Sequence, residues 1–510
     1  MIITLGDRHF SCRDILSFAQ DGNQLVLSAA SLARISAGRT IVEKMASGSQ
    51  PIYGVNTGLG GNLRHRIPVG DIEDFQTQIV FGRMIGLGPA LDPAICRAIL
   101  LCRLIELSSG ATGVSLETIQ LLIELFNRGV TPVIPSLGSI GASDIGVLAH
   151  LAAVVIGHGE AWCNGERMAG GKALAAVGLQ PATLRAKDGI GLVNHAAACA
   201  TLAAHAVCAL EDALLAATAA AALSCEGYGA NPSILDPRLH AARPASGQVE
   251  AAAMMRRALA GSSIHEPGSA RYVQDALSFR LLAPALGATL GALATARRES
   301  EIEINGVTVT PMIFIDDHDI LSSPNFHTPA LSLAFDALAI SLTHFASLSA
   351  FRLSKLMTAA FSGLPQYLSP VGGGSAGYVS LQKTTSALYC DIRSCAAPVG
   401  LDALPVSDTV EDVASYAMQA IVKVRRQLER FGYLIAIEAL AAAQAVDLRA
   451  PPKLGAASSC LHQAIRHVVP PLHADRPPGA DVEDVLTCLY DPALVARLRA
   501  IIMVQGGSPS

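Results

Sequence analysis

The chain has 510 residues, which is long enough to bury a large core and by length predicts about two to four domains. A net charge of −5 and a pI near 6.3 give no overall attraction to nucleic acid or to an anionic membrane, so we expect neither as a partner. Hydrophobic residues make up 51% of the chain and charged residues 15%, so much of its surface is expected to lie between subunits.

Neither a membrane span nor an export signal is expected. The most apolar run, Ala213–Cys225, is shorter than the roughly 20 residues that cross a bilayer. Met1–Phe10 contains charged residues and lacks the apolar stretch of a signal peptide, so we expect a cytoplasmic protein. The 11 cysteines include no Cys-x-x-Cys pair, and they are expected to be reduced core residues, with no disulfide framework and no metal site.

The N-terminal part combines glycine-rich turns with short helices, and apolar residues at helical spacing predict helices over Pro93–Ser108 and Leu116–Asn127. Residues Gly191–Ser224 are nearly continuous Ala and Leu, and similar patterns recur at Ala330–Lys355 and Ala414–Ala443. Helices that are hydrophobic on most faces are typical of the inside of a helical bundle that also packs against other subunits.

Strand signals are few, and Ile302–Ile315, with its alternating β-branched residues, is the clearest of them. The predicted fold class is therefore mainly α. We expect an N-terminal mixed region over residues 1–190, followed by a central long-helix bundle and a C-terminal helical region over residues 191–510.

The segment Tyr53–Gly61 reads Tyr-Gly-Val-Asn-Thr-Gly-Leu-Gly-Gly. Glycines at this density let the backbone turn sharply and approach a ligand closely. A Tyr in such a loop could act as a base if nearby positive charge favoured the phenolate, because a free phenol has a pKa of about 10. The alternative is a structural turn with a packed Tyr, and the spacing taken alone favours that alternative.

The segment Pro135–His150 reads Pro-Ser-Leu-Gly-Ser-Ile-Gly-Ala-Ser-Asp-Ile-Gly-Val-Leu-Ala-His. It resembles the Gly-Ser-x-Gly-Ala-Ser-Gly-Asp-Leu-x-Pro-Leu-Ala-His signature of the aromatic amino-acid ammonia-lyases, which also have Tyr-Gly-Val-Asn-Thr-Gly-x-Gly upstream. In that family the Ala-Ser-Gly tripeptide cyclises to methylidene-imidazolone (MIO), an electrophile that captures the substrate amine. The resemblance implies a carbon–nitrogen lyase with a histidine ammonia-lyase-like helical bundle, whose smaller N-terminal region carries the active-site loops.

Further landmarks follow in the family's order. Asp188–Asn194 resembles Glu-Gly-Leu-Ala-Leu-Ile-Asn, whose Asn lies beside the cofactor. Val273–Arg280 resembles Val-Gln-Asp-Pro-Tyr-Ser-Leu-Arg, whose Arg holds the substrate carboxylate, as a guanidinium fork is suited to do. Asn325–His327 resembles Asn-Phe-His, and Glu411 lies at the Glu that faces the substrate side chain in the histidine-specific branch.

The chain departs from this pattern at positions that carry out the family's chemistry. Between Gly141 and His150 the chain is one residue shorter than the family segment, so Ala142-Ser143-Asp144 stands where Ala-Ser-Gly-Asp is expected. Ring closure folds the third residue's amide nitrogen back onto the first residue's carbonyl, a geometry that favours Gly. Asp144 is instead expected to be the N-cap of the helix beginning near Ile145. No MIO is therefore expected as a cofactor.

Other family positions also change. Arg83 stands where the family has a substrate-side His, Leu277 replaces a second active-site Tyr, and His195 replaces the Gly after the Asn. Lys383 stands where the family usually has an apolar or aromatic residue. Of these changes the Lys is the least compatible with neutral drift, because burying an unpaired Lys beside a substrate pocket is costly.

Without MIO, an amine must already be a good leaving group, and a quaternary ammonium departs as a neutral tertiary amine. In lacking the ring residue and gaining a Lys, the chain resembles the ergothionase branch, which releases trimethylamine from ergothioneine and leaves thiourocanate. The resemblance implies that Tyr53 is the base, that Arg280 with Asn194 holds the carboxylate, and that Glu411 and Lys383 act on the imidazole-thione. The remaining predicted substrate-binding residues are Arg83, His195, Asn325 and Phe326. The Phe326 ring is expected to pack on the trimethylammonium group by cation–π contact.

Two alternatives remain open. One is an MIO-dependent histidine ammonia-lyase in which Ala142-Ser143-Asp144 forms an unusual ring, and the other is a non-catalytic homologue that only binds. Retention of Tyr53 and Arg280 speaks against the second. The resemblance also implies a homotetramer whose active sites draw residues from three subunits, with a small amino acid or betaine as substrate.

Overall fold

The computed structural model describes residues 1–20, 22–401 and 403–503. These residues form two compact units, each assembled from three segments of the chain. The described residues of the first unit lie within 1–208, 296–335 and 398–422, and those of the second within 209–295, 336–397 and 423–503. This division differs from a single boundary at residue 190, because two later segments of the chain return to the N-terminal part and pack with it.

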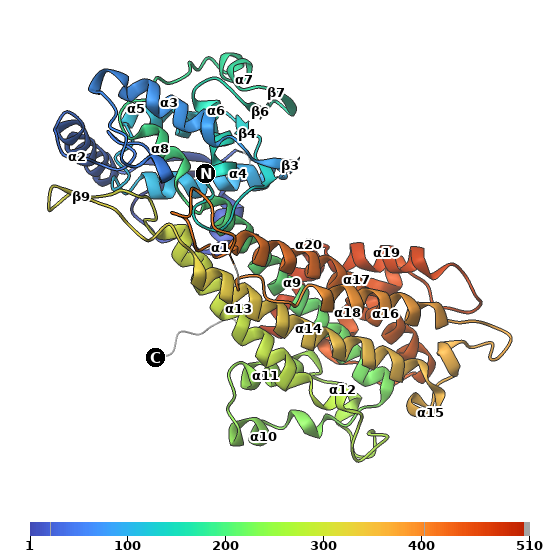
Figure 1. The fold of residues 1–510 in the computed structure, drawn as a ribbon. Helices are drawn as coiled ribbons and strands as arrows, with labels where there is room; N and C mark the ends of the chain where they lie inside the picture. Colours follow the sequence, from blue (N-terminus) through green and yellow to red (C-terminus); the bar gives the residue numbers. More distant parts are fainter. Residues whose placement is uncertain (21, 402, 504–510) are drawn as a thin grey trace. The chain divides into compact units, whose positions relative to one another are not determined.

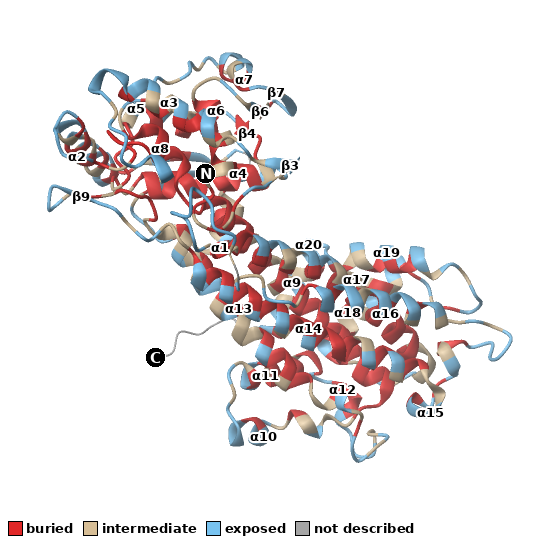
Figure 2. Cartoon of the chain, viewed as in Figure 1, coloured by how far each residue is buried: buried red, intermediate tan, exposed pale blue. Residues whose placement is uncertain are grey.

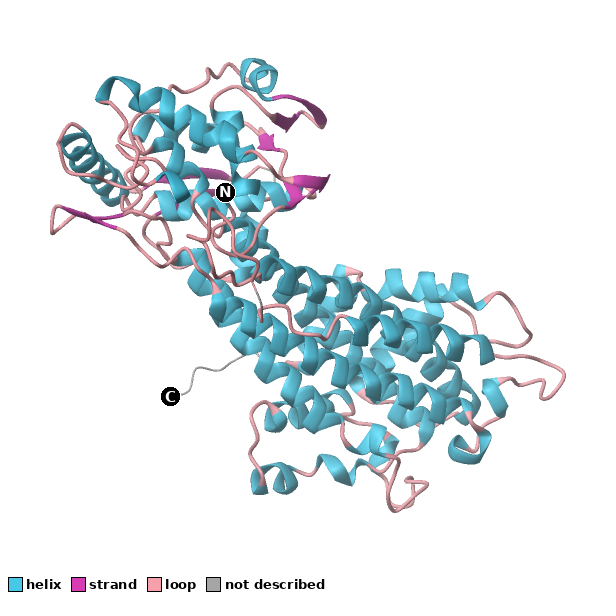
Figure 3. Ribbon diagram, viewed as in Figure 1, coloured by secondary structure: helices cyan, strands magenta, loops and turns pink. Residues whose placement is uncertain are grey.

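The first unit carries short helices and all the strands that the described residues form (Figures 1 and 3). Its helices are α1 (Cys12–Phe18), α2 (Ala29–Ala46), α3 (Ile72–Arg83), α4 (Pro93–Leu107), α5 (Leu116–Asn127), α6 (Ile145–Val155), α7 (Gly170–Ala176) and α8 (Asp188–Val193), with 3-10 turns at η1 (Gly60–Asn62) and η2 (Val69–Asp71). Its strands are β1 (Ile2–Leu5), β2 (Gln24–Leu27), β3 (Leu87–Ala90), β4 (Thr131–Pro132), β5 (Pro135–Leu137), β6 (Glu160–Cys163), β7 (Glu166–Ala169), β8 (Met312–Phe314) and β9 (Asp319–Leu321).

The strands pair only in small sheets. β1 and β2 are parallel, β3 pairs with β5, β8 pairs with β9, and β4, β6 and β7 form an antiparallel three-stranded sheet. The strand predicted over Ile302–Ile315 is wrong for its first part, because the helix α13 continues to Asn305 and buries Ile304 in the core. Only Met312–Phe314 is a strand within that range.

Four long helices have residues in both units: α9 (Ala197–Tyr228), α13 (Leu282–Asn305), α14 (Pro329–Met357) and α17 (Ala417–Arg449). The second unit adds α10 (Pro237–Ala242), α11 (Gln248–Ala258), α12 (Leu277–Arg280), α15 (Ala359–Ser362), α16 (Val379–Ser394), α18 (Ala456–Val468), α19 (Pro478–Leu489) and α20 (Pro492–Ile502), with 3-10 turns at η3 (Pro232–Leu235), η4 (Ser263–His265) and η5 (Gln366–Leu368). The mainly α class is confirmed, and the predicted helices all exist, with bounds that differ by a few residues.

One predicted helix is interrupted. The apolar run Gly191–Ser224 is divided between α8, which ends at Val193, and α9, which starts at Ala197. Arg103 of α4 donates from Nε to the carbonyl of Leu192 at 3.2 Å, so a carbonyl near the end of α8 is satisfied by a side chain instead of by a further helical turn. The interruption delivers Asn194 to the cavity described below.

Three helical segments are long and apolar enough to cross a membrane by length and composition: Asp188–Tyr228, Pro329–Met357 and Ala417–Arg449. In the most apolar window of each, 83%, 72% and 83% of the residues are buried within the protein. Figure 2 shows this burial along α9, α14 and α17. Their apolar side chains therefore pack against other parts of the chain, as expected for the inside of a helical bundle.

A buried ion pair joins three of these helices inside the second unit. Glu438 of α17 accepts from Arg352 of α14 at 2.6 Å and 2.8 Å, and both side chains are about 1% exposed. Ser224 of α9 donates to the same carboxylate at 2.8 Å, and so does Ser349 of α14. With both oxygens satisfied, the carboxylate can stay charged in the core and fixes how α9, α14 and α17 pair.

Replacing Arg352 by Met is expected to lower the free energy of unfolding by about 3–5 kcal/mol, because it leaves the Glu438 carboxylate buried without its cation. Denaturant unfolding of the full chain measures this change. Arg430→Met is the control, since the partly exposed Arg430 lies on α17 near the exposed Asp391 and its loss should change stability by at most about 1 kcal/mol. Equal effects of the two substitutions would contradict the role of the buried pair.

The first unit also contains a partly buried carboxyl group whose protonation equilibrium is strongly shifted by its surroundings. Burial raises the pKa of Glu303, on α13, to about 7, and the nearby acids Asp144, Glu299 and Glu106 act in the same direction. One of its carboxylate oxygens is buried without a hydrogen-bond partner among the described residues. Compared with the unfolded chain, the folded protein therefore favours the neutral form of the Glu303 carboxyl group.

Because the folded pKa lies above the ordinary value of 4.5, Glu303 makes the fold less stable as pH rises from about 4.5 to about 7. Glu303→Gln should therefore match the parent's stability near pH 4.5 and exceed it by up to about 3 kcal/mol above pH 7. Unfolding curves at a series of pH values test this expectation, with the exposed Glu73→Gln as control. A stability difference independent of pH would contradict it.

Candidate active site

A cavity of about 660 Å³ lies within the first unit. Polar side chains from separate segments line it, among them Tyr53 from the glycine-rich loop, Arg83 from the end of α3, Asn194 from the turn after α8, and Glu411 from the 398–422 segment. Ala142 and Ser143 line it as well. The structure thus brings a phenol, a guanidinium, an amide and a carboxylate together around one space.

The loop that carries Tyr53 folds back on itself. The Tyr53 hydroxyl accepts a hydrogen bond from the backbone N–H of Gly60 at 3.1 Å, and its side chain is half-buried. A Cβ on Gly61 would lie only 2.9 Å from a carboxylate oxygen of Asp408. The Tyr53 loop therefore lies close to the Asp408 side chain, in the segment that carries Glu411.

That opposing segment has an unusual backbone. Ser407, Asp408 and Thr409 all have positive φ angles, of 55°, 54° and 66°. A bridge between Val406 and Glu411 closes the turn, and Ser407 Oγ donates to Glu411 Oε1 at 2.9 Å. Three successive left-handed residues are costly outside glycine, so the backbone here is held by its surroundings. The result is a carboxylate that is exposed to the cavity with one oxygen oriented.

Arg83 is the cation of the cavity. Burial lowers the pKa of its guanidinium, while the nearby Tyr53 and Glu411 act in the opposite direction. Its guanidinium has no hydrogen-bond or ion-pair partner within the described ranges 1–20, 22–401 and 403–503. The group remains charged because the ordinary pKa of Arg is so high. It can therefore offer its donors to an anionic group and add positive potential near the Tyr53 hydroxyl.

Asn194 and Ser143 meet at the wall of the cavity. Ser143 Oγ donates to Asn194 Oδ1 at 3.0 Å, and the backbone N–H of Thr310 donates to the same oxygen at 3.3 Å. These two donors orient the amide so that its NH2 group is left for another partner. Asn194 is therefore positioned as a hydrogen-bond donor.

The segment Ala142-Ser143-Asp144 is held on both sides. The N–H of Ser143 donates to the carbonyl of Phe326 at 2.8 Å, and the N–H of Asp144 donates to that of His195 at 2.8 Å. Ser143 has a φ of 58°, in the left-handed region. The backbone donors of the two residues are thus both used in contacts outside the segment.

The Asp144 carboxylate is fully buried and bonded. It accepts from Ser139 Oγ at 2.6 Å and from the N–H of Cys199, in the first turn of α9, at 2.8 Å. Burial raises the pKa of Asp144, although these hydrogen bonds and one from the Ala198 N–H lower it. Asp144 is the N-cap residue of α6, as predicted, but its side chain does not bond to that helix and instead accepts from the first turn of α9.

Several predicted site residues do not line this cavity. His195 is fully buried, and its side chain lies 3.8 Å from Glu106, behind the cavity wall. Phe326 contributes its backbone carbonyl to Ser143, while its ring is absent from the lining. Asn325 is exposed and donates to the carbonyl of Val307.

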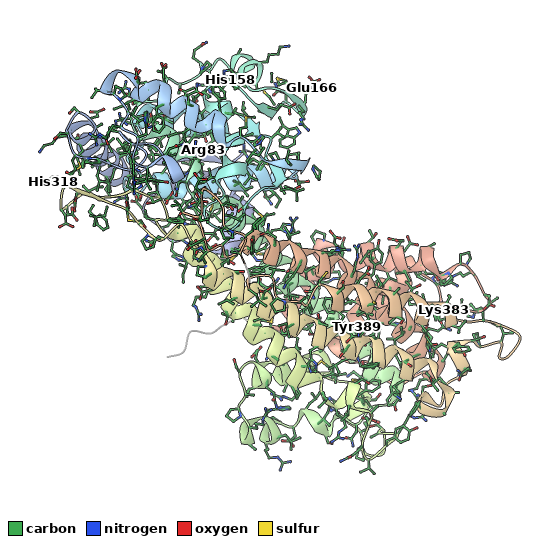
Figure 4. The ribbon with its side chains drawn as sticks, in the orientation of Figure 1. Arg83, His158, Glu166, His318, Lys383 and Tyr389 are labelled. Carbon is green, nitrogen blue, oxygen red and sulfur yellow. The ribbon has the colours of Figure 1, made fainter. Side chains whose placement is uncertain are left out.

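Arg280 and Lys383 belong to the second unit. Arg280 ends α12 and donates to Gln274 at 3.4 Å, and Lys383 is exposed on α16, where Figure 4 labels it. Lys383 is accessible within its own chain, and its predicted contact with the substrate stays a prediction. Arg83 is labelled in the same figure on the first unit, and it is the cation that the described lining contains.

Sequence patterns missed part of the site. Ser407 orients Glu411, and Asp408 lies close to Gly61 of the Tyr53 loop. Both stand in a polar stretch of the sequence with no distinctive spacing. Gln76, which is 0% exposed beneath the Tyr53 loop, was also missed, because helical periodicity marks buried positions only where they are apolar. A polar residue inside an apolar helix face would have been the signal.

A phenol, an oriented carboxylate, an amide donor and a free guanidinium can together remove a proton from carbon and stabilise the charge that develops. Residues 10–467 match the aromatic amino acid lyase family. A histidine ammonia-lyase of Myxococcus xanthus is 36% identical over 489 residues, which cover 96% of each chain.

Two solved structures are similar over nearly the whole chain. Ergothionase from Treponema denticola, in complex with desmethyl-ergothioneine sulfonic acid, has a TM-score of 0.93 at 31% identity and covers 97% of this chain and 99% of its own. Histidine ammonia-lyase from Trypanosoma cruzi has a TM-score of 0.88 at 28% identity, covering 100% and 99%. The predicted family and fold are confirmed. The chain belongs to the aromatic amino acid lyase family, and it is a carbon–nitrogen lyase of the ammonia-lyase type.

Proposed function

We propose that this lyase eliminates trimethylamine from ergothioneine and leaves thiourocanate, as an ergothionase does. The observation that carries the proposal is the set of contacts at Asp144, which occupies the position where the family's ring-forming tripeptide ends. The likeness to the Treponema denticola ergothionase supports the same substrate class.

The residues present do not fit the MIO group. Ring closure would turn the amide nitrogen of Asp144 towards the carbonyl carbon of Ala142. That nitrogen now donates to His195 O, and the attached carboxylate accepts from Ser139 and Cys199. Turning it would leave a fully buried carboxylate without its donors, at a cost of several kcal/mol, on the order expected for an unpaired buried charge.

The proposed reaction needs no electrophile on the enzyme. Tyr53, as phenolate, takes the proton from the carbon next to the one that bears nitrogen. The electrons of that C–H bond form the new C=C bond, and the electrons of the C–N bond leave with nitrogen as neutral trimethylamine. A primary ammonium would be a poor leaving group here, so the proposal requires a substrate that carries a quaternary ammonium group.

The remaining roles follow from charge. Arg83 stabilises the negative charge that develops on the substrate, and Glu411 faces the imidazole ring. Asn194 donates to the substrate carboxylate. Arg280 and Lys383 are proposed to reach the substrate from other copies of the chain, since both are at least partly accessible and neither lines the cavity of its own first unit.

We therefore propose a homotetramer with shared active sites. Exposed apolar side chains support it, among them Leu333, Ile340 and Phe351, which stand 60%, 50% and 55% exposed along α14 and would be covered by a second copy. A cytoplasmic location is proposed as well, where cysteines stay reduced; none of the 11 cysteines forms a disulfide among the described residues. No membrane or nucleic-acid partner is proposed.

A histidine ammonia-lyase is the second candidate. It is favoured by the names of the relatives, such as that of Myxococcus xanthus, at 36% identity. It would require Ala142-Ser143-Asp144 to form the ring despite the contacts described above, and it would release ammonia from histidine.

Incubating the purified chain with ergothioneine is expected to release trimethylamine and to form thiourocanate, measured by its absorbance, whereas histidine should release no ammonia. The intact mass should equal that of the unmodified sequence, because no waters are lost without ring formation. A MIO-containing histidine ammonia-lyase run in parallel serves as the positive control for ammonia release and for the loss of two waters in the mass measurement. Ammonia from histidine together with the loss of two waters would replace this proposal by the second candidate.

Tyr53→Phe is expected to lower kcat/KM by at least about 100-fold, because it removes the base while keeping the ring. Steady-state kinetics of trimethylamine release measure the change. Tyr433→Phe is the matched control: this exposed hydroxyl lies outside the cavity, beside Glu483, and its loss should leave the rate within about twofold. Unchanged elimination by Tyr53→Phe from every tested substrate would show that another group is the base.

A further inference from the structure

A single buried amide lies between the Tyr53 loop and α8. Gln76, on α3, is 0% exposed. Its Nε2 donates to the carbonyl of Gly54 at 3.0 Å, and its Oε1 accepts from the N–H of Ile190 at 3.3 Å. Gly54 directly follows Tyr53, and Ile190 lies in the helix that ends before Asn194.

The orientation of this amide is forced by its partners. A carbonyl oxygen can only accept and a backbone N–H can only donate, so the Gln76 NH2 group must face Gly54 and its oxygen must face Ile190. The N–H of Ile190 lies in the first turn of α8, where backbone donors have no partner inside the helix. Gln76 thus satisfies one orphan donor of α8 and one carbonyl of the loop with the same side chain.

The neighbouring backbones are shaped for this contact. A Cβ on Gly189 would lie 2.2 Å from the carbonyl oxygen of Gln76, so only glycine lets α3 and α8 approach so closely. Gly54 has a φ of 65°, and a Cβ there would lie 3.4 Å from Ile190. The loop therefore rests on α8 through Ile190 as well as being tied to it through Gln76.

We infer that Gln76 is a positioning residue for the elimination: it holds the loop that carries Tyr53 in register with the helix that delivers Asn194. This inference rests on the proposed role of Tyr53. Gln76 itself is not among the residues that line the cavity, so it acts through the two groups that it aligns. Misplacing a reacting group by about 1 Å can cost on the order of 100-fold in rate.

Gln76→Met tests the inference, because Met has a similar length and makes neither hydrogen bond. We expect kcat to fall by at least about tenfold. Amide hydrogen exchange over residues 50–63 should become faster. Gln78→Met is the matched control, since Gln78 is exposed two residues later on the same helix, and it should change neither quantity. Gln76→Glu keeps the acceptor for Ile190 but loses the donor to Gly54, and it serves if Gln76→Met fails to fold.

A double-variant comparison separates positioning from general stability. If Gln76 acts through Tyr53, its substitution should cost little further activity in a Tyr53→Phe background. An equal loss in both backgrounds, unchanged exchange of the loop, or a kcat within twofold of the parent would each overturn the inference. If Tyr53→Phe alone keeps full activity, the proposed function is at fault; faster loop exchange in Gln76→Met would then still show that Gln76 anchors the loop.

Discussion

The pocket depends on the Asp144 carboxylate, which is buried and has no cationic partner in the part of the chain that the structure describes. Its charge is balanced by dipoles: the first-turn N–H groups of the 32-residue helix α9 and the Ser139 hydroxyl donate to it. The N-terminus of a helix is a favourable place for an anion, because its unsatisfied donors and its dipole both point at the charge. Asp144 in this way ties Ser143, and through it Asn194, to the start of a long helix.

The same kind of contact recurs deeper in the protein. Ala-rich helices can slide past one another at little cost, because small apolar surfaces look alike from one turn to the next. Hydrogen bonds of fixed geometry cannot slide. Glu438 with Arg352 sets the pairing of three helices, and Arg103 ends α8 at the turn that places Asn194. The apolar residues supply most of the stabilising burial, and the few buried polar groups select one arrangement.

The sequence was sufficient for the fold class and for the residues around the cavity that carry family motifs. Leu116–Asn127 is a helix over the predicted range, since Ser115 precedes a strongly periodic apolar run. The break after Val193 could not be predicted, because neither Gly nor Pro follows it, and Arg103, which bonds to the neighbouring Leu192 carbonyl, comes from another helix. The side-chain partner of Asp144 could not be predicted for a similar reason: local spacing marks the residue before α6 but cannot reveal a partner 55 residues away.

The close approach of Gly61 to Asp408 has a consequence for how such a site can change. The loop that carries Tyr53 and the turn that carries Glu411 meet where Gly61 lies close to the Asp408 side chain, and the turn has a left-handed backbone. A side chain at position 61 would displace the Asp408 side chain beside it, so a substitution in the Tyr53 loop also reaches the turn that holds Glu411. The two segments form one continuous stretch of the cavity wall, and a change made in one of them alters the surroundings of the other.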